Sequence, residues 1–204
     1  HCTDAEFYGD AYDNYGLFGE DHRNDRHIKT VMAHCVYSSD DEIKRLYDNG
    51  VFVAHCPASN VNLSSGIAPI RRYIDEGLKI GLGSDVAGGH TESMLSAVCD
   101  AVQVSKLYWR IIDQSKLPLT FDEAFFLGTK GGGEFFGKVG SFEEGYDFSA
   151  VVLDDAVIPY PGELSLHDRL ERAAYLSLDL IGLHAKYVSG KKIFDHMAEE
   201  RRSI

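Results

Sequence analysis

The sequence has 204 residues, of which 44% are hydrophobic, and a formal net charge of −12 at pH 7. Its length and apolar content suffice for one large domain with a sizeable core, and they exclude global disorder. The negative charge argues against nucleic-acid binding, because the phosphate backbone would be repelled. No apolar run is long enough to span a membrane, and the four cysteines show no CxxC spacing. We therefore expect a cytoplasmic protein with free thiols.

Two expected strands in the first third of the sequence end on histidine. Residues 28–35 and 51–57 are rich in apolar and β-branched side chains, and each segment contains Ala-His-Cys at or near its end. This pattern is typical of buried strands. His34 and His55 therefore lie at the ends of two strands.

The segments between these strands favour helices. The sequence Ser-Asp-Asp-Glu at 39–42 is a capping box that opens a helix after the first strand. After the second strand, a polar loop is expected over 57–66 before apolar residues recur at helical spacing. Repeated strand-helix units imply parallel strands with helices outside, so the polar strand ends are expected at one rim.

A third short apolar run, residues 78–82, is followed by a lone acid, Asp85, with glycines on both sides. Asp85 then lies where a buried parallel strand opens into a loop, the position at which barrel and open α/β enzymes keep their catalytic residues. Gly81 and Gly83 allow a neighbouring backbone, metal or ligand to approach closely. The alternative is that Asp85 only caps the helix expected to begin near Thr91.

His34, His55 and Asp85 are thus expected on the same rim. Imidazoles and a carboxylate at neighbouring strand ends can hold a divalent metal, and zinc accepts both kinds of ligand in an open catalytic site. A bound metal lowers the pKa of water toward neutrality, and an adjacent Asp can accept the proton. A histidine that is not a ligand can donate to the oxyanion of a tetrahedral intermediate. The alternative is three polar residues that only satisfy backbone groups at strand ends.

The pattern changes near residue 140. Before it, Thr-Phe-Asp-Glu at 120–123 is a second capping box that opens a helix, and three glycines at 131–133 permit a tight turn. After it, the sequence predicts a strand, a helix and a pair of short strands, over 148–153, 164–178 and 185–194. We therefore expect a boundary between residues 1–139 and a smaller β subdomain at 140–204.

Four segments carry a family resemblance: VMAH at 31–34, AHCPASN at 54–60, LSSG at 63–66 and GLGSDVAGG at 81–89. Together they resemble the guanine deaminases, a family within the metal-dependent amidohydrolase superfamily. The Gly-Ser-Asp sequence alone marks only the superfamily, whereas Asp-Val-Ala-Gly-Gly together with Ala-His-Cys-Pro-x-Ser-Asn is more specific to the guanine deaminases. The likeness covers nearly the whole chain.

The resemblance implies an α/β fold, the (β/α)₈ or TIM-like barrel, joined to a small β-sandwich subdomain. Only three clear strand-helix units are present where a closed barrel needs eight. We therefore expect residues 1–139 to form the second half of the barrel and residues 140–204 to supply C-terminal strands of the sandwich, in a chain that is part of a longer protein. The resemblance also implies one zinc ion per complete chain, hydrolytic deamination of guanine to xanthine and ammonia, and a homodimer.

The resemblance further assigns roles to five residues. Asp85 is similar to the last-strand zinc ligand that also contacts the substrate and accepts the proton of the attacking water. His34 is similar to a catalytic histidine that polarises the attacked centre or steadies the hydroxide. His55 is similar to a histidine that is not a ligand and shapes the substrate pocket. His1 is expected to bind zinc and contact the substrate, and Asp4 stands where the family has a glutamate that binds the purine ring and shuttles a proton to it.

The start of the chain departs from the family pattern. Asp4 is one methylene shorter than the expected glutamate, and Glu6 is a second candidate for that role. His1 has a tag remnant as its alternative interpretation. The amino-terminal His-x-His pair of the family is absent from the sequence. Two alternative functions therefore stay open: an amidohydrolase that deaminates or dechlorinates another amino-heterocycle, such as a triazine or a modified adenosine, and an inactive binding module of the same fold.

Overall fold

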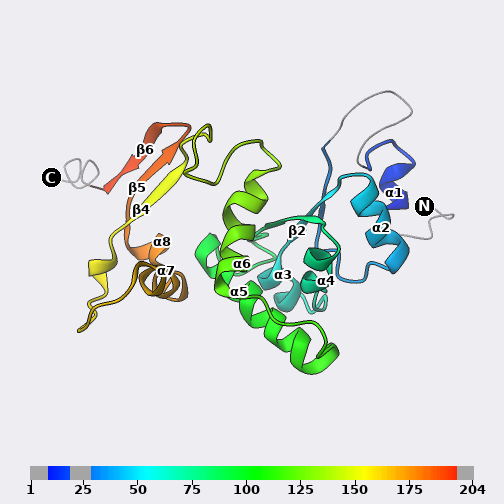
Figure 1. The fold of residues 1–204 in the computed structure, drawn as a ribbon, viewed down its shortest axis with the longest axis horizontal. Coiled ribbons are helices and arrows are strands. Elements are labelled where there is room, and N and C mark those ends of the chain that lie inside the picture. The colour runs from blue at the N-terminus through cyan, green and yellow to red at the C-terminus, as the bar shows by residue number, and fades with distance from the viewer. Residues whose placement is uncertain (1–8, 19–28, 197–204) are drawn as a thin grey trace.

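The computed structural model describes residues 9–18 and 29–196, which form two β-sheets with helices packed around them (Figure 1). In Figure 1, helices α5 (Met94–Leu107) and α6 (Phe121–Phe126) lie between the two sheets. The prediction of an α/β fold is confirmed. Within the described ranges, no helix combines the length and the apolar character needed to cross a membrane.

The first sheet consists of three short parallel strands in the order β1-β2-β3. They are β1 (Val31–Ala33), β2 (Phe52–His55) and β3 (Lys79–Leu82). Met32, Val53 and Ile80 pair across the sheet, and all three are buried in the core. The predicted series of parallel strands is therefore confirmed, and their carboxyl ends lie at one edge of the sheet.

Helices cover one face of this sheet with buried apolar side chains. Ile43 and Leu46 of α2 (Asp40–Asp48) and Tyr73 of α4 (Ile70–Asp75) belong to the same core cluster as the buried strand residues. This burial follows the 3.6-residue period of apolar residues along each helix. The core therefore lies between the sheet and its helices, which holds the strand ends in place.

The two predicted capping boxes both begin helices, but they are closed differently. The hydroxyl of Thr120 accepts a hydrogen bond from the N–H of Glu123 at 3.2 Å, and the Glu123 carboxylate returns to the N–H of Thr120 at 2.8 Å. Ser39 likewise accepts from the N–H of Glu42 at 3.2 Å. The Glu42 carboxylate instead accepts from the N–H of Gly9 at 3.0 Å. Only the second box is therefore complete, because a tertiary partner engages Glu42.

Helix α5 has its own cap. The hydroxyl of Ser93 accepts a hydrogen bond from the N–H of Ser96 at 2.9 Å and donates to Oδ1 of Asp179 at 2.7 Å. The helix continues as a π-helical turn, η1 (Tyr108–Ile112). Since Ser93 occupies the cap position, the alternative that Asp85 caps this helix is wrong.

The segment after β2, expected as a polar loop over 57–66, begins as a helix, α3 (Pro57–Asn62). Pro57 lies in its first turn, where the fixed φ of proline suits a helix and the missing N–H costs no hydrogen bond. Ser59 and Asn60 are fully buried in this helix, which packs against α5. The loop prediction is wrong here because tertiary packing outweighs the polar composition.

The three glycines at 131–133 also differ from their prediction. They lie at the end of a helical segment, α6 followed by the π-helical turn η2 (Leu127–Gly131), instead of in a tight turn. Gly132 packs directly against Gly81 of β3, since a Cβ on Gly81 would lie 2.9 Å from the Gly132 Cα. The glycines therefore allow a close approach between helix and sheet.

The second sheet is antiparallel, in the order β4-β5-β6, and confirms the predicted C-terminal strands. Its hairpin turns at Ser189 and Gly190, both with positive φ. The predicted helix over 164–178 is divided in two, at Leu176 and Ser177. The remaining bounds are β4 (Ala150–Leu153), η3 (Asp155–Val157), α7 (Leu166–Tyr175), α8 (Leu178–Ile181), β5 (Leu183–Val188), β6 (Lys191–Asp195) and, near the start, α1 (Asp10–Asp13).

Candidate active site

Asp85 and His34 meet at the carboxyl edge of the parallel sheet. Nε2 of His34 lies 3.8 Å from Oδ2 of Asp85, and both side chains are about two-fifths exposed, at 41% and 42%. The two residues follow β3 and β1, which flank β2, so the parallel register brings them together across 51 positions of sequence. The prediction that they share one rim is confirmed.

The backbone at both residues leaves the strand in the left-handed region. The φ angle is 70° at His34 and 48° at Asp85. Asp and His populate this region more readily than most residues, but it is still uncommon outside glycine. Such conformations cluster at functional sites, where the surrounding structure holds them in place. At His34, the backbone is restrained by a hydrogen bond of 2.9 Å from its N–H to the carbonyl of Ala54.

Two residues of α3 hold these side chains. The hydroxyl of Ser59 donates to Oδ2 of Asp85 at 2.6 Å, and Nδ1 of His34 lies 2.8 Å from Oδ1 of Asn60. The sequence contained both residues within the AHCPASN segment, but gave no reason to assign them contacts. The signal that could have located them is Pro57, which begins the helix in which they lie.

His55 is the last residue of β2 and is buried, so of the three residues expected on the rim it is the one that is not exposed there. Its side chain is 1% exposed, and neither ring nitrogen has a hydrogen-bond partner among the described residues. Burial, together with nearby His34, lowers the pKa of His55 to about 4, so the ring is neutral at pH 7. A direct contact with substrate stays a prediction for this residue.

The cysteines near the rim behave as buried free thiols. Burial is the main cause that raises the pKa of Cys35 to about 12 and that of Cys56 to about 11. Cys99, within α5, is likewise free and its pKa is raised to about 11 by burial. The expectation of free thiols is confirmed for these three residues, although Cys35 is only partly buried.

The remaining predicted site residues, His1 and Asp4, lie outside the described residues, as does Glu6. Within the described ranges there is no group of three or more His, Cys, Asp and Glu side chains that could hold a metal. Asp85 keeps one carboxylate oxygen, Oδ1, apart from the Ser59 contact, whereas Nε2 of His34 lies 3.8 Å from Oδ2. The Asp85 carboxylate fits one side of an open zinc site, which requires further ligands from elsewhere.

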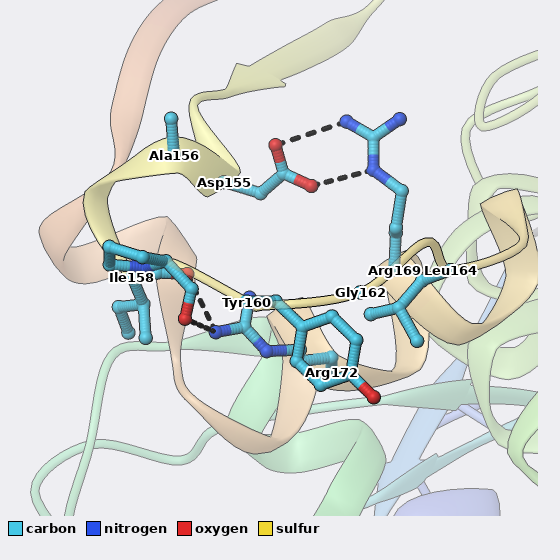
Figure 2. Close-up of a pocket in the computed structure, with 9 residues that line it drawn as sticks. Asp155, Ala156, Ile158, Tyr160, Gly162, Leu164, Arg169 and Arg172 are labelled. Carbon is cyan, nitrogen blue, oxygen red and sulfur yellow. Dashed lines mark hydrogen bonds and ion pairs between the residues drawn. The ribbon is translucent and has the colours of Figure 1, made fainter.

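A separate pocket of about 390 Å³ lies in the C-terminal part and contains two arginines (Figure 2). Arg169 forms two hydrogen bonds to Asp155, at 2.6 and 3.0 Å, and Arg172 donates to the carbonyl of Ile158 at 2.6 Å. Their charges are therefore engaged within the pocket wall. This pocket, built from residues 155–172, contains neither Asp85 nor His34.

Residues 3–188 match the amidohydrolase family. The chain belongs to the amidohydrolase family. This finding agrees with the rim described above, and it covers both the parallel sheet and most of the antiparallel sheet.

Curated amidohydrolase relatives support the more specific resemblance. The guanine deaminase of Dictyostelium discoideum is 36% identical over 196 residues, which are 92% of this chain and 41% of the relative. The guanine deaminase of Rattus norvegicus is also 36% identical, over 91% of this chain and 41% of its own length. The resemblance to guanine deaminases is therefore confirmed, and the chain spans about two-fifths of the length of these relatives.

Solved structures of guanine deaminases also resemble this chain. The guanine deaminase of C. acetobutylicum, determined with guanine in its active site, is 45% identical with a TM-score of 0.85, over 93% of this chain and 43% of that one. The guanine deaminase of E. coli is 30% identical with a TM-score of 0.78, over 95% of this chain and 44% of that one. A zinc-bound adenosine deaminase from Xanthomonas campestris is 21% identical, with a TM-score of 0.70, over 95% of this chain and 43% of that one, and shares the fold only.

Proposed function

We propose that the protein carrying this chain hydrolyses guanine to xanthine and ammonia with the help of one zinc ion. The observation that carries the proposal is the Asp85–His34 pair, 3.8 Å apart, at the ends of the two strands that flank β2. It occurs in a chain 45% identical with a guanine deaminase that was solved with guanine bound. That likeness supports guanine as the substrate.

The proposal includes a division of the fold. Residues 1–139 would be the second half of a (β/α)₈ barrel, and residues 140–204 would return to a small β-sandwich subdomain. The three parallel strands and the separate antiparallel sheet support this division. The two-fifths coverage of the relatives is in keeping with a barrel completed by other parts of the protein. A homodimer is proposed on the family resemblance alone.

Asp85 and His1 would hold the metal, with the other ligands outside this chain. A bound zinc ion would lower the pKa of a water molecule toward neutrality, which supplies a nucleophile at pH 7. Asp85 would accept a proton on Oδ1, the oxygen that Ser59 does not engage. His34, with Nδ1 bonded to Asn60, would present the lone pair of Nε2 to the attacking water and steady the resulting hydroxide. Asp4 would carry a proton to the purine ring, and His55 would shape the floor of the pocket.

One other substrate class has a specific observation in its favour. The 5-methylthioadenosine/S-adenosylhomocysteine deaminase 2 of Archaeoglobus fulgidus is 37% identical over 76% of this chain and 35% of that protein. A modified adenosine is therefore the second candidate substrate. The remaining alternative is a binding module that kept the fold without the chemistry. A His-x-His pair upstream in the full-length protein would favour an enzyme over this module.

The test is an ammonia-release assay on the full-length protein with its metal content measured. We expect about one zinc ion per chain and turnover of guanine in preference to adenine, cytosine and 5-methylthioadenosine. Preference for 5-methylthioadenosine would transfer the proposal to the second candidate. A fully zinc-loaded protein that releases no ammonia from any of these compounds would support the inactive module.

A further inference from the structure

Ser59 and Asn60 are consecutive residues in the first turn of α3, and each contacts a different residue of the rim. We propose that they are positioning residues, which set the orientation of Asp85 and His34 for the reaction. The reaction that these residues would serve is the one in the proposed function. The contacts themselves are hydrogen bonds among the described residues.

Ser59 determines which oxygen of Asp85 is available. The Ser59 side chain is completely buried and its hydroxyl donates to Oδ2 at 2.6 Å. A Cβ on Gly88 would lie 2.8 Å from the Ser59 Oγ and 2.9 Å from Oδ2 of Asp85, so the chain closes tightly over this hydrogen bond. The carboxylate is therefore held in one orientation, with Oδ1 apart from the hydroxyl. A neighbour that orients a ligating carboxylate typically contributes one to two orders of magnitude to metal affinity or activity.

Asn60 determines the tautomer of His34. An amide oxygen only accepts hydrogen bonds, so the contact of Oδ1 with Nδ1 of His34, at 2.8 Å, places a proton on Nδ1. In the neutral ring, Nε2 then carries the lone pair, and this nitrogen faces Asp85. Asn60 thereby fixes both the ring orientation and the atom presented to the site.

The burial of the Asn60 amide argues for a role beyond folding. Its side chain is 1% exposed, yet Nδ2 has no hydrogen-bond partner among the described residues. A buried donor without a partner loses its hydrogen bonds to water on folding and gains none in return, which lowers stability. A residue selected for stability alone would avoid this cost, whereas one needed to orient His34 can carry it.

The two contacts act together because they come from one rigid element. Both join residues that are 26 positions apart, from one helical turn to two different strand ends. A shift of α3 would move Asp85 and His34 at the same time. Sites held by packed elements keep their geometry better than sites held by loops alone.

The first test compares Ser59→Ala with Ser105→Ala in the full-length protein. Ser105 is a matched control, because its buried hydroxyl donates to the carbonyl of Val102 and accepts from the N–H of Leu119, far along α5 from the rim. We expect Ser59→Ala to lower kcat and weaken zinc affinity by about 10- to 100-fold, with KM changed by less than about threefold. Ser105→Ala should keep both values. Equal effects of the two variants on kcat and zinc affinity would overturn the role of Ser59.

The second test reads the tautomer of His34 by ¹⁵N NMR of labelled histidine, with His34→Gln used to assign the signal. We expect the Nδ1–H form in the wild type and in Asn60→Asp, which keeps an acceptor oxygen, and its loss in Asn60→Ala. An Nε2–H form in the wild type would overturn the role of Asn60, even if Asn60→Ala does not fold. A wild type that fails to deaminate guanine would refute the proposed function, whereas the tautomer and the zinc affinity would still decide the positioning roles.

Discussion

The backbone at Asp85 and His34 turns out of the strands through left-handed conformations, with φ of 48° and 70°. An extended residue at either position would point its side chain above or below the sheet. The left-handed turn instead lets the carboxylate and the imidazole approach to 3.8 Å at the sheet edge. The chemistry proposed for this protein therefore depends on the geometry of two individual residues, more than on the strands that carry them.

Replacing Asp85 by asparagine tests its two proposed roles, zinc ligand and proton acceptor. The change is nearly isosteric, and the amide oxygen of the new side chain can still accept the hydrogen bond from Ser59, so folding should be retained. An amide cannot take up the proton, and we expect kcat of the full-length protein to fall by about 10²- to 10⁴-fold. Steady-state kinetics and circular dichroism together measure this. Activity within a few-fold of the wild type would remove Asp85 from the mechanism.

His55 predicts a pH dependence of stability. Its pKa is lowered to about 4 in the folded state, whereas an unfolded histidine titrates near 6.5. Between these two values the unfolded chain binds a proton that the folded chain does not. The stabilisation is therefore fully present above about pH 6.5 and is lost as the pH falls toward 4, by about 1.4 kcal/mol per unit within that window.

Urea unfolding of the full-length wild type and of His55→Asn at about pH 7, 6 and 5 measures this effect. Other groups contribute equally to both proteins, so the difference between their slopes isolates His55. We expect the wild type to lose more stability than the variant on acidification. Parallel pH profiles would contradict a buried neutral imidazole.

At the scale of elements, the contact between β3 and the end of η2 leaves no room for side chains. A Cβ on Gly81 would lie 2.9 Å from the Cα of Gly132, which is backbone and cannot move aside easily. At Gly83, a Cβ would instead meet the Sγ of Cys56 at 3.0 Å, the end of a side chain that can shift. A side chain at Gly81 would therefore have to displace backbone, whereas one at Gly83 would have to displace only a thiol.

Gly81→Ala is expected to destabilise the full-length protein by about 1–3 kcal/mol, the usual cost of overpacking. Gly83→Ala should cost less, because a thiol can rotate away. The change in the urea midpoint of each variant measures the difference. An equal or smaller loss for Gly81→Ala would show that β3 and η2 can separate without cost.

At the scale of the whole molecule, the parallel sheet is open at both sides in the part of the chain described. β1 and β3 are its edge strands, and the order β1-β2-β3 pairs each of them on one side only. Large apolar side chains that follow η2 along the chain are also exposed, including Phe136 at 78% and Phe142 at 81%. Edge strands and apolar patches of this kind favour association unless another segment covers them. The proposed completion of the barrel would cover them within one protein.

The 204-residue chain produced alone is therefore expected to self-associate as its concentration rises, whereas the full-length protein is not expected to aggregate. Light scattering coupled to gel filtration measures both. Val31→Lys is the matched variant, because it places a charge on the exposed side of the edge strand β1 and should reduce association of the isolated chain. An isolated chain that stays monomeric at all concentrations would contradict the open-sheet explanation.

Much of the fold could be predicted because its signals are local. These signals are short apolar runs, apolar residues at helical spacing, capping sequences such as 120–123 and the repeated Ala-His-Cys ending. Each depends only on near neighbours along the chain. The same local signals failed where a distant partner intervened. Glu42 binds Gly9 and leaves its capping box open, and residues 57–62 form a helix because α5 covers them.

The sequence by itself determined the parallel units, the rim residues His34 and Asp85, and the family resemblance that the comparisons confirm. Only the tertiary structure decided that Ser59 and Asn60 hold those two residues. Their hydrogen bonds join positions 26 residues apart, and they form only when the strands lie in register and α3 is buried beside them. Such contacts have no periodic signature, because they depend on where separate elements come together in space.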